Sequence, residues 1–206
     1  MKLQSVCVYC GSFSSAKQVY KDAAVETGRR LGESGLSMVY GGGNVGLMGL
    51  TADSAIRAGA KVVGIIPTFI TSREPQHPGL TELVEVGDMH TRKRFMAERS
   101  DGFLILPGGF GTLDEFAEIL TWRQLGLHQK PIVAVNINGF WDNLRRQLDY
   151  MLEEGFIKPQ HRALVGFVDT VKEALPLLKQ MVENTEVSAD GPKPAHDEVK
   201  DGMNRV

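Results

Sequence analysis

Short runs of apolar residues alternate along the chain with longer stretches whose apolar positions recur about every 3.6 residues. The runs are continuously apolar, which is typical of strands buried on both faces of a parallel sheet. This alternation predicts an α/β fold with helices on both faces of a parallel sheet. The expected strands cover 5–10, 36–40, 61–67, 102–107 and 131–136, and the expected helices cover 19–35, 45–58, 89–100, 113–125 and 140–154.

The remaining segments are less regular. Residues 80–86 fit either a further strand or an extended link, and residues 167–183 predict a last helix with Asp169 as its N-cap. Pro176 falls inside that helix and predicts a kink or a break. Residues 184–206 are polar without an apolar period, so we expect a disordered tail after a single nucleotide-binding domain over 1–183.

Composition narrows the functional classes. The chain has 206 residues, 42% of them hydrophobic and 23% charged, with a formal net charge of −2. A net charge this close to zero gives no indication that the protein binds nucleic acid or an acidic membrane surface. No apolar run approaches the ~20 residues of a transmembrane helix, and the first apolar stretch is too short for a signal peptide. We expect a cytoplasmic protein with neither nucleic acid nor a membrane as partner.

The two cysteines, Cys7 and Cys10, form one C-x-x-C pair. A zinc site needs further ligands of this kind, and the sequence has no second pair, so we predict no metal. The pair belongs to an expected strand, where residues three apart point to opposite faces. We therefore interpret both as small buried hydrophobes.

Three glycine-rich clusters follow expected strands, at Cys10–Ser12, Gly41–Gly43 and Gly108–Thr112. The carboxyl ends of parallel strands share one edge, which is where open α/β sheets bind ligands. Glycine permits close approach of the backbone, and the N–H groups of a following helix favour an anion. A tight turn explains one cluster equally well, but three at one edge favour a phosphate-bearing ligand. The clusters match neither a dinucleotide fingerprint nor a P-loop.

Acidic residues adjoin the last cluster. Thr112 and Glu115 fit a capping box, and Asp114 and Glu115 suit the first turn of a helix. A phosphate there would be repelled unless the ligand also presented positive charge, as a ribosyl group does when it becomes an oxocarbenium ion. The pattern thus favours a sugar phosphate joined to a leaving group. Asp114 and Glu115 point about 100° apart on a helix, so we expect one to face the ligand.

A basic segment lies at 89–99, where Arg92, Lys93 and Arg94 fall near the start of an expected helix. Such a cluster is either a solvated face or the partner of an anion. Basic residues are usually found at the C-terminal end of a helix, whereas these lie near the N-terminal end. Their position therefore favours the second interpretation, in which they face an anion or the carboxylate of Glu115.

Taken together, these motifs resemble a known family. PGGFGTLDE (107–115), DMHTRKRFM (88–96), VYGGGNVGLMG (39–49) and TWRQLG (121–126) are similar to signatures of the LOG family, the cytokinin-activating nucleoside 5′-monophosphate phosphoribohydrolases, over about residues 5–180. The resemblance implies a Rossmann-like doubly wound parallel sheet and a homodimer. It also implies hydrolysis of the N-glycosidic bond of cytokinin riboside 5′-monophosphates or AMP, without a cofactor.

By motif position, the resemblance implies that Arg92 and Glu115 are the catalytic pair. This family usually has glutamate where this chain has Asp114, and if this position contacts the ligand, we expect the shorter side chain to shift affinity or base preference without loss of the chemistry. From the resemblance and the glycine clusters together, we expect ligand contacts at Gly11, Ser12, Gly42, Gly43, Glu74, Lys93, Gly108, Gly109, Phe110, Gly111, Thr112, Asp114 and Thr121.

Two other functions remain open at this point. A non-catalytic nucleotide carrier or sensor on the same fold would bind AMP without releasing base. A lysine decarboxylase, a label that relatives of this family have carried, would hold a pyridoxal cofactor, but no cofactor lysine setting can be identified in the sequence. The sequence leaves the choice between adenine and an N6-modified adenine open.

Overall fold

The computed structural model describes residues 2–70 and 75–189, with side chains through residue 184. Its centre is a sheet of seven parallel strands in the order β4-β3-β2-β1-β5-β6-β7. The strands are β1 (Ser5–Tyr9), β2 (Ser37–Tyr40), β3 (Val62–Pro67), β4 (Glu82–Val86), β5 (Gly102–Ile105), β6 (Ile132–Val135) and β7 (Val165–Val168).

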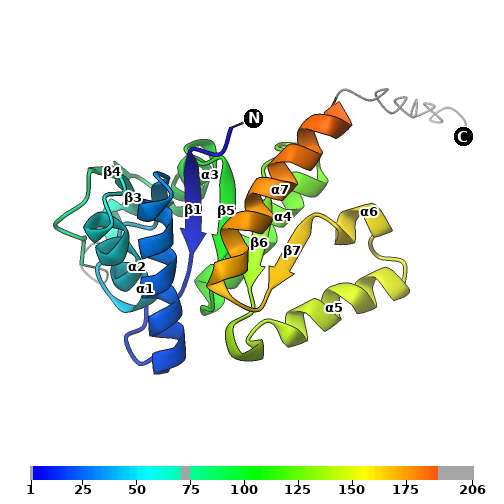
Figure 1. Cartoon of the computed structure of the whole chain (residues 1–206), viewed down its shortest axis with the longest axis horizontal. Helices are drawn as coiled ribbons and strands as arrows, with labels where there is room; N and C mark the ends of the chain where they lie inside the picture. The colour runs from blue at the N-terminus through cyan, green and yellow to red at the C-terminus, as the bar shows by residue number, and fades with distance from the viewer. Residues whose placement is uncertain (1, 71–74, 190–206) are drawn as a thin grey trace, which may run out of the picture.

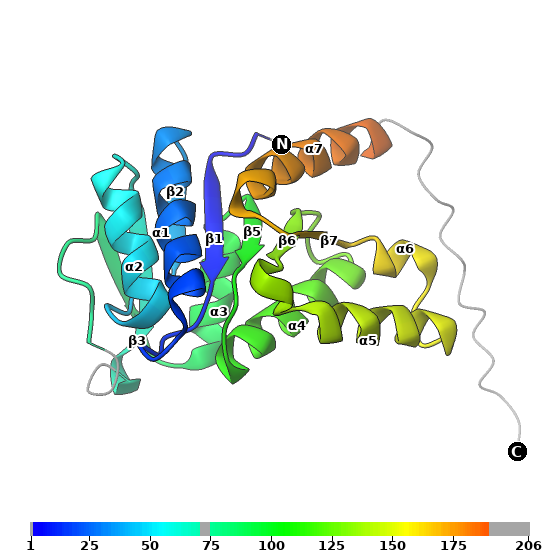
Figure 2. The same ribbon diagram turned by 60° about the horizontal axis from the view of Figure 1, so that its bottom comes forward.

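Helices cover both faces of this sheet. Figure 1 shows α1 and α7 in front of the sheet and α3 and α4 behind it, and in Figures 1 and 2 the pair α1 and α2 lies at the opposite end of the molecule from α5 and α6. The helices are α1 (Gln18–Glu33), α2 (Gly46–Arg57), α3 (Met89–Glu98), α4 (Phe110–Gln124), α5 (Asp142–Glu153), α6 (Pro159–Arg162) and α7 (Val171–Ala189), with short 3-10 turns η1 (Thr68–Ile70) and η2 (Ile137–Gly139). The predicted fold class is confirmed.

Strand β1 divides the interior into two hydrophobic clusters. Val6 and Val8 belong to the cluster beneath α1, α2 and α7, whereas Cys7 and Tyr9 belong to the one beneath α3, α4 and α5. Cys10 rejoins the first cluster, so the two cysteines lie on opposite faces as predicted. Both are buried free thiols, and burial is the main cause that raises the pKa of each. The interpretation as buried hydrophobes is confirmed.

The C-terminal part differs most from the expectation. The apolar residues before Asp169 form the edge strand β7, so the last helix begins only at Val171. Asp169 is not its N-cap: its carboxylate accepts a hydrogen bond from Asn136 (3.2 Å), while Thr170 pairs with Glu173 through both its backbone N–H and its hydroxyl. The expected N-cap was therefore wrong by one residue.

Helix α7 is not broken at Pro176, and it continues to Ala189, past the boundary expected at residue 183. Residues 190–206, which hold the rest of the expected tail, lie outside the described part of the chain. The segment 80–86 forms strand β4 rather than a link. Within the described ranges, no helix is long and apolar enough to cross a membrane.

Helices α1 and α2 pack closely because Gly28 has no side chain. A Cβ at Gly28 would lie 2.2 Å from the carbonyl oxygen of Thr51 and 2.7 Å from the backbone nitrogen of Ala55. These are backbone atoms, so the helices would have to move apart to accept it.

We expect Gly28→Ala to destabilise the protein by about 1–3 kcal/mol, as overpacking of a well-packed interior does. The sign of this change in the free energy of unfolding is informative, because replacing glycine by alanine inside a helix otherwise stabilises a protein by up to about 1 kcal/mol. Chemical denaturation measures the difference. The control is Gly87→Ala, where a Cβ meets nothing within 4 Å. A Gly28→Ala protein as stable as the wild type would contradict the packing described here.

Candidate active site

The site lies where the strand order changes direction. Strands β1 and β5 are neighbours, and the chain runs outward from β1 to β4 on one side and from β5 to β7 on the other. The loops after β1 and β5 therefore diverge, which forms the crevice where such sheets bind ligands. The Gly11 N–H donates to the Pro107 carbonyl (3.1 Å), and the Gly11 carbonyl accepts from Leu47 N–H (2.9 Å). These bonds bring the loops after β1, β2 and β5 together at one edge.

The N-terminus of α4 forms one wall of this crevice. Gly109 is its N-cap in an extended conformation, so the helix begins at Phe110, and the expected capping box of Thr112 and Glu115 is wrong. This early start places Thr112 inside the first turn. Gly108 has no room for a side chain, because a Cβ there would lie 2.1 Å from Thr112 Oγ1.

Space remains on the outer side of this first turn. A Cβ at Gly109 or Gly111 would meet nothing within 4 Å. The first N–H groups of an α-helix have no partner within the helix, and its dipole favours negative charge there. These features agree with an anion at this loop, and its contact with a ligand stays a prediction. Phe110, expected to touch the ligand, is 92% exposed at its rim.

The adjacent acids Asp114 and Glu115 have different surroundings. Asp114 is largely exposed and pairs with Lys93, whose Nζ lies 3.0 Å from Asp114 Oδ2 and 3.1 Å from Glu118 Oε1. Burial alone would lower the pKa of Lys93, but the hydrogen bonds and charges of Asp114 and Glu118 outweigh it, and this pKa is raised. Lys93 therefore stays positively charged and ties α3 to α4.

Glu115 is half-buried and lies close to the end of β1. Burial is the largest cause that raises the pKa of the Cys7 thiol and of the Cys10 thiol, and the negative charge of Glu115 is the second largest. The charge of Glu115 is therefore felt by the two thiols of β1 and the loop after it, while the neighbouring Asp114 pairs with Lys93 at the surface. This difference agrees with the angular separation expected for consecutive residues of a helix.

Arg92 is 5% exposed and is held by main-chain carbonyls. Its Nη2 donates to Gly41 O (2.7 Å), directly after β2, and its Nε donates to Ile65 O (3.0 Å), within β3. A Cβ at Gly41 would lie 2.2 Å from Nη2, so this first glycine is needed for the guanidinium to fit. The expectation that Arg92 also faces an anion or Glu115 stays a prediction.

The second glycine cluster is covered by the segment 75–77. Gly42 O accepts from His77 N–H (3.1 Å), and Gly43 forms an antiparallel bridge with Gln76. Sequence reasoning missed His77, which is buried and whose Nδ1 accepts from Gly79 N–H (3.1 Å), leaving Nε2 to donate to Asp53 (3.2 Å). Gly42 and Gly43 are thus engaged within the chain, and their contact with a ligand stays a prediction.

A pocket of about 290 Å³ opens beside the glycine loop. The expected residues Gly11, Gly108 and Gly109 line it, together with residues that the sequence analysis did not identify. The additional lining residues are Ser15, Ala16, Lys17, Tyr20, Leu47, Pro107 and Phe140. Pro107 and Leu47 lie inside two of the quoted motifs, and Ser15 and Lys17 lie between the first glycine cluster and the helix after it, but none of them was predicted as a ligand contact.

Among the expected contacts that do not line this pocket are Thr121 and Ser12. Thr121 lies at the far end of α4, donates to Ala117 O (2.7 Å) and lines a separate groove between α4 and α5. Ser12 packs beside the turn into α2, where a Cβ at Gly46 would lie 2.5 Å from its carbonyl oxygen. Glu74 lies outside the described residues. In the part of the chain that the structure describes, no three His, Cys, Asp or Glu side chains are grouped to hold a metal.

Solved structures share this architecture. The molybdenum cofactor binding protein from Rippkaea orientalis superposes with a TM-score of 0.68 at 21% identity, covering 88% of this chain and 99% of that chain. The molybdenum cofactor carrier protein of Chlamydomonas reinhardtii gives the same TM-score at 19% identity, with the same coverage. At such identities the likeness shows the fold alone.

Sequence comparison identifies nearer relatives. A family model described as "Possible lysine decarboxylase" matches residues 48–178. Cytokinin riboside 5′-monophosphate phosphoribohydrolase LOG1 of Arabidopsis thaliana is 42% identical over 185 residues, 90% of this chain and 87% of that protein. The probable phosphoribohydrolase LOGL9 of Oryza sativa is 45% identical over 163 residues, 79% of this chain and 72% of that protein. The chain therefore belongs to the LOG family, whose members among these relatives are named cytokinin riboside 5′-monophosphate phosphoribohydrolases.

Proposed function

We propose that this protein hydrolyses the N-glycosidic bond of cytokinin riboside 5′-monophosphates, of AMP or of both, giving a free purine base and ribose 5-phosphate. The observation that carries this proposal is the arrangement on α4. Its first turn is open to an anion, and the half-buried Glu115 on the next turn lies near the end of β1. The names of the LOG relatives support the same reaction.

The chemistry follows from this arrangement. The 5′-phosphate binds the N–H groups at the start of α4, and the ribose extends along the helix toward Glu115. As the bond from C1′ to the base breaks, positive charge develops on the ribosyl group, which a carboxylate stabilises. Water supplies the hydroxyl that C1′ gains and the proton that the departing base takes up, and Glu115 either stabilises the charge or activates that water.

Arg92 and Lys93 shape the surroundings of this carboxylate. The guanidinium of Arg92 is fixed by the carbonyls of Gly41 and Ile65, which places a permanent positive charge at the edge of the sheet. Lys93 offsets the charges of Asp114 and Glu118, so these two acids repel the phosphate less. Both residues support a site in which phosphate and carboxylate lie close together.

The alternative functions have less support. A carrier or sensor would use the same glycine loop but would not need Glu115 near the strand end. A pyridoxal-dependent decarboxylase needs a lysine at the ligand site that can lose its proton, and at this site the carboxylates around Lys93 raise the pKa of Lys93. Burial lowers the pKa of Lys130, but Lys130 lines a different groove, with Trp122 and His128. Measuring free base released from AMP and from an N6-isopentenyl-adenosine monophosphate separates these functions, since a carrier binds both without releasing base.

We further propose a homodimer that uses the groove between α4 and α5. This groove of about 230 Å³ is lined mainly by apolar side chains, including Leu120, Leu148 and Met151. Thr121 lies in it, about 14 Å along the helix axis from Thr112, so a ligand contact by Thr121 is more easily made to the site of a second copy. A cytoplasmic location stays a prediction.

We expect Glu115→Gln to lower kcat for base release by about 10²–10⁴-fold, because glutamine keeps the shape but removes the charge. The matched control is Asp114→Asn on the adjacent residue, whose carboxylate is 59% exposed and faces Lys93. Its kcat should stay within several-fold of wild type. Chromatography of free base under saturating substrate gives both values, and near-normal turnover by Glu115→Gln would remove this residue from the mechanism.

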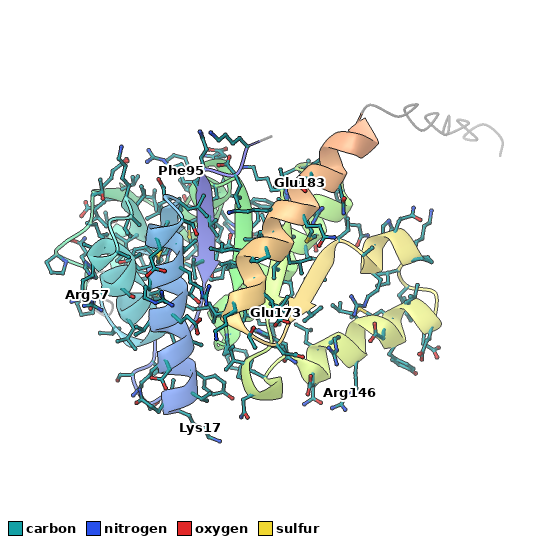
Figure 3. The ribbon with its side chains drawn as sticks, in the orientation of Figure 1. Lys17, Arg57, Phe95, Arg146, Glu173 and Glu183 are labelled. Atoms are coloured by element: carbon teal, nitrogen blue, oxygen red, sulfur yellow. The ribbon has the colours of Figure 1, made fainter. Side chains whose placement is uncertain are left out.

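The dimer has its own test. Met151→Glu places a charge in the apolar groove and should convert the dimer to a monomer, as measured by sedimentation velocity. Arg146→Glu introduces the same residue on the outer side of α5, where Arg146 points away from the rest of the molecule in Figure 3, and should leave the dimer intact. Circular dichroism melting checks that both variants fold. A wild type that sediments as a monomer would contradict the proposal.

A further inference from the structure

The pocket beside the glycine loop carries polar groups that the proposed mechanism has not used. Lys17 and Tyr20, at the start of α1, and Ser15, in the loop before it, share this pocket with Gly108 and Gly109. Figure 3 shows Lys17 at the N-terminal end of α1, which is the end at the carboxyl edge of the sheet. One wall of the pocket is therefore the anion-binding loop, and the facing wall comes from the segment after β1.

Two other cations near this edge, Arg92 and Lys93, are already engaged. Arg92 donates to the carbonyls of Gly41 and Ile65, and Lys93 is held between two carboxylates. Lys17, in contrast, is exposed and forms no ion pair or side-chain hydrogen bond with any described residue. A phosphate bound by the glycine loop would lie close to Glu115, so a nearby uncompensated cation would offset their repulsion.

The hydroxyl groups of the pocket are also available. Within the described ranges, neither the Ser15 hydroxyl nor the Tyr20 hydroxyl has a hydrogen-bond partner, and the Tyr20 ring is positioned by an edge contact with Phe140 (5.7 Å between centroids). Hydroxyl groups can donate to phosphate oxygens, and a lysine on its flexible stem binds phosphate as a point charge. Together these side chains form a polar wall opposite the N–H groups of α4.

We propose that Lys17 is a substrate-binding residue that supplies the positive charge for the 5′-phosphate, with Ser15 and Tyr20 as additional hydrogen-bond donors. This inference rests on the proposed function, because it takes the phosphate of a nucleoside 5′-monophosphate as the ligand. It assigns the recognition of the phosphate to α1 as well as to α4. Lys17 therefore determines affinity for the phosphorylated substrate and takes no part in breaking the glycosidic bond.

The test compares Lys17→Met with Lys21→Met. Lys21 lies one turn further along the same helix and outside this pocket, so its variant changes the net charge equally. We expect Lys17→Met to raise the KM for AMP by about tenfold or more, as the loss of a charged hydrogen bond does, with kcat within about twofold of wild type. Lys17→Arg should restore most of the affinity. Lys21→Met should behave as wild type.

A binding measurement separates this inference from the reaction itself. Calorimetric titration with ribose 5-phosphate requires no turnover, and Lys17→Met should weaken this binding by the same factor as it raises KM. Equal affinity of wild type and Lys17→Met for ribose 5-phosphate would overturn the role of Lys17, whether or not base is released. A wild type that releases no base but binds ribose 5-phosphate through Lys17 would instead overturn the hydrolase and retain the phosphate site.

Discussion

The buried guanidinium of Arg92 ties together elements that are far apart in the sequence. It extends from α3 to the carbonyls of Gly41 and Ile65, and so it joins β3 and the loop after β2 to the helix that precedes β5. A buried charged group is very costly unless its hydrogen bonds are made, so the surrounding backbone must keep these carbonyls in place. The glycine at position 41 follows from this requirement, because a Cβ there would lie 2.2 Å from Arg92 Nη2.

A second constraint comes from the concentration of acids beside an anion site. Asp114, Glu115 and Glu118 lie within two turns of α4, which would be unfavourable next to a phosphate if all three charges acted on it. Lys93 takes Asp114 and Glu118 as partners, whereas the charge of Glu115 raises the pKa of Cys7 in β1. The structure therefore answers how a loop suited to an anion can sit beside several carboxylates.

The sequence predicts the central strands well because their apolar runs are continuous and are separated by glycine-rich turns. The sequence does not predict β7, because the short apolar run of this strand directly precedes the apolar positions of α7. The spacing of apolar residues does not show where the strand ends and the helix begins. The prediction at Thr112 was also wrong, because a T-x-x-E pattern suggested a cap there but the helix begins two residues earlier, at Phe110, with Gly109 as its N-cap. Local patterns identify elements, but their exact starts depend on neighbouring backbone.

The candidate site shows the same limit more clearly. Glycine clusters and the resemblance identify the loop, Arg92 and Glu115, because these residues form contiguous motifs. Lys17, Tyr20 and His77 belong to no such motif, and their placement depends on β1 lying beside β5 and on residues 75–77 folding over the loop after β2. Such long-range pairings are not contained in the local pattern of any one segment.

The rigidity of α4 has a consequence for which nucleotides can react. Because the phosphate-binding turn and Glu115 belong to one helix, their separation is fixed by the helical rise of about 1.5 Å per residue and cannot stretch to suit the ligand. A nucleotide phosphorylated at the 2′ or 3′ hydroxyl would place its C1′ at a different distance from the anchored phosphate. Under the proposed function, selectivity for a phosphate at the 5′ position therefore follows from the fixed geometry of this helix and needs no side chain that blocks the other isomers.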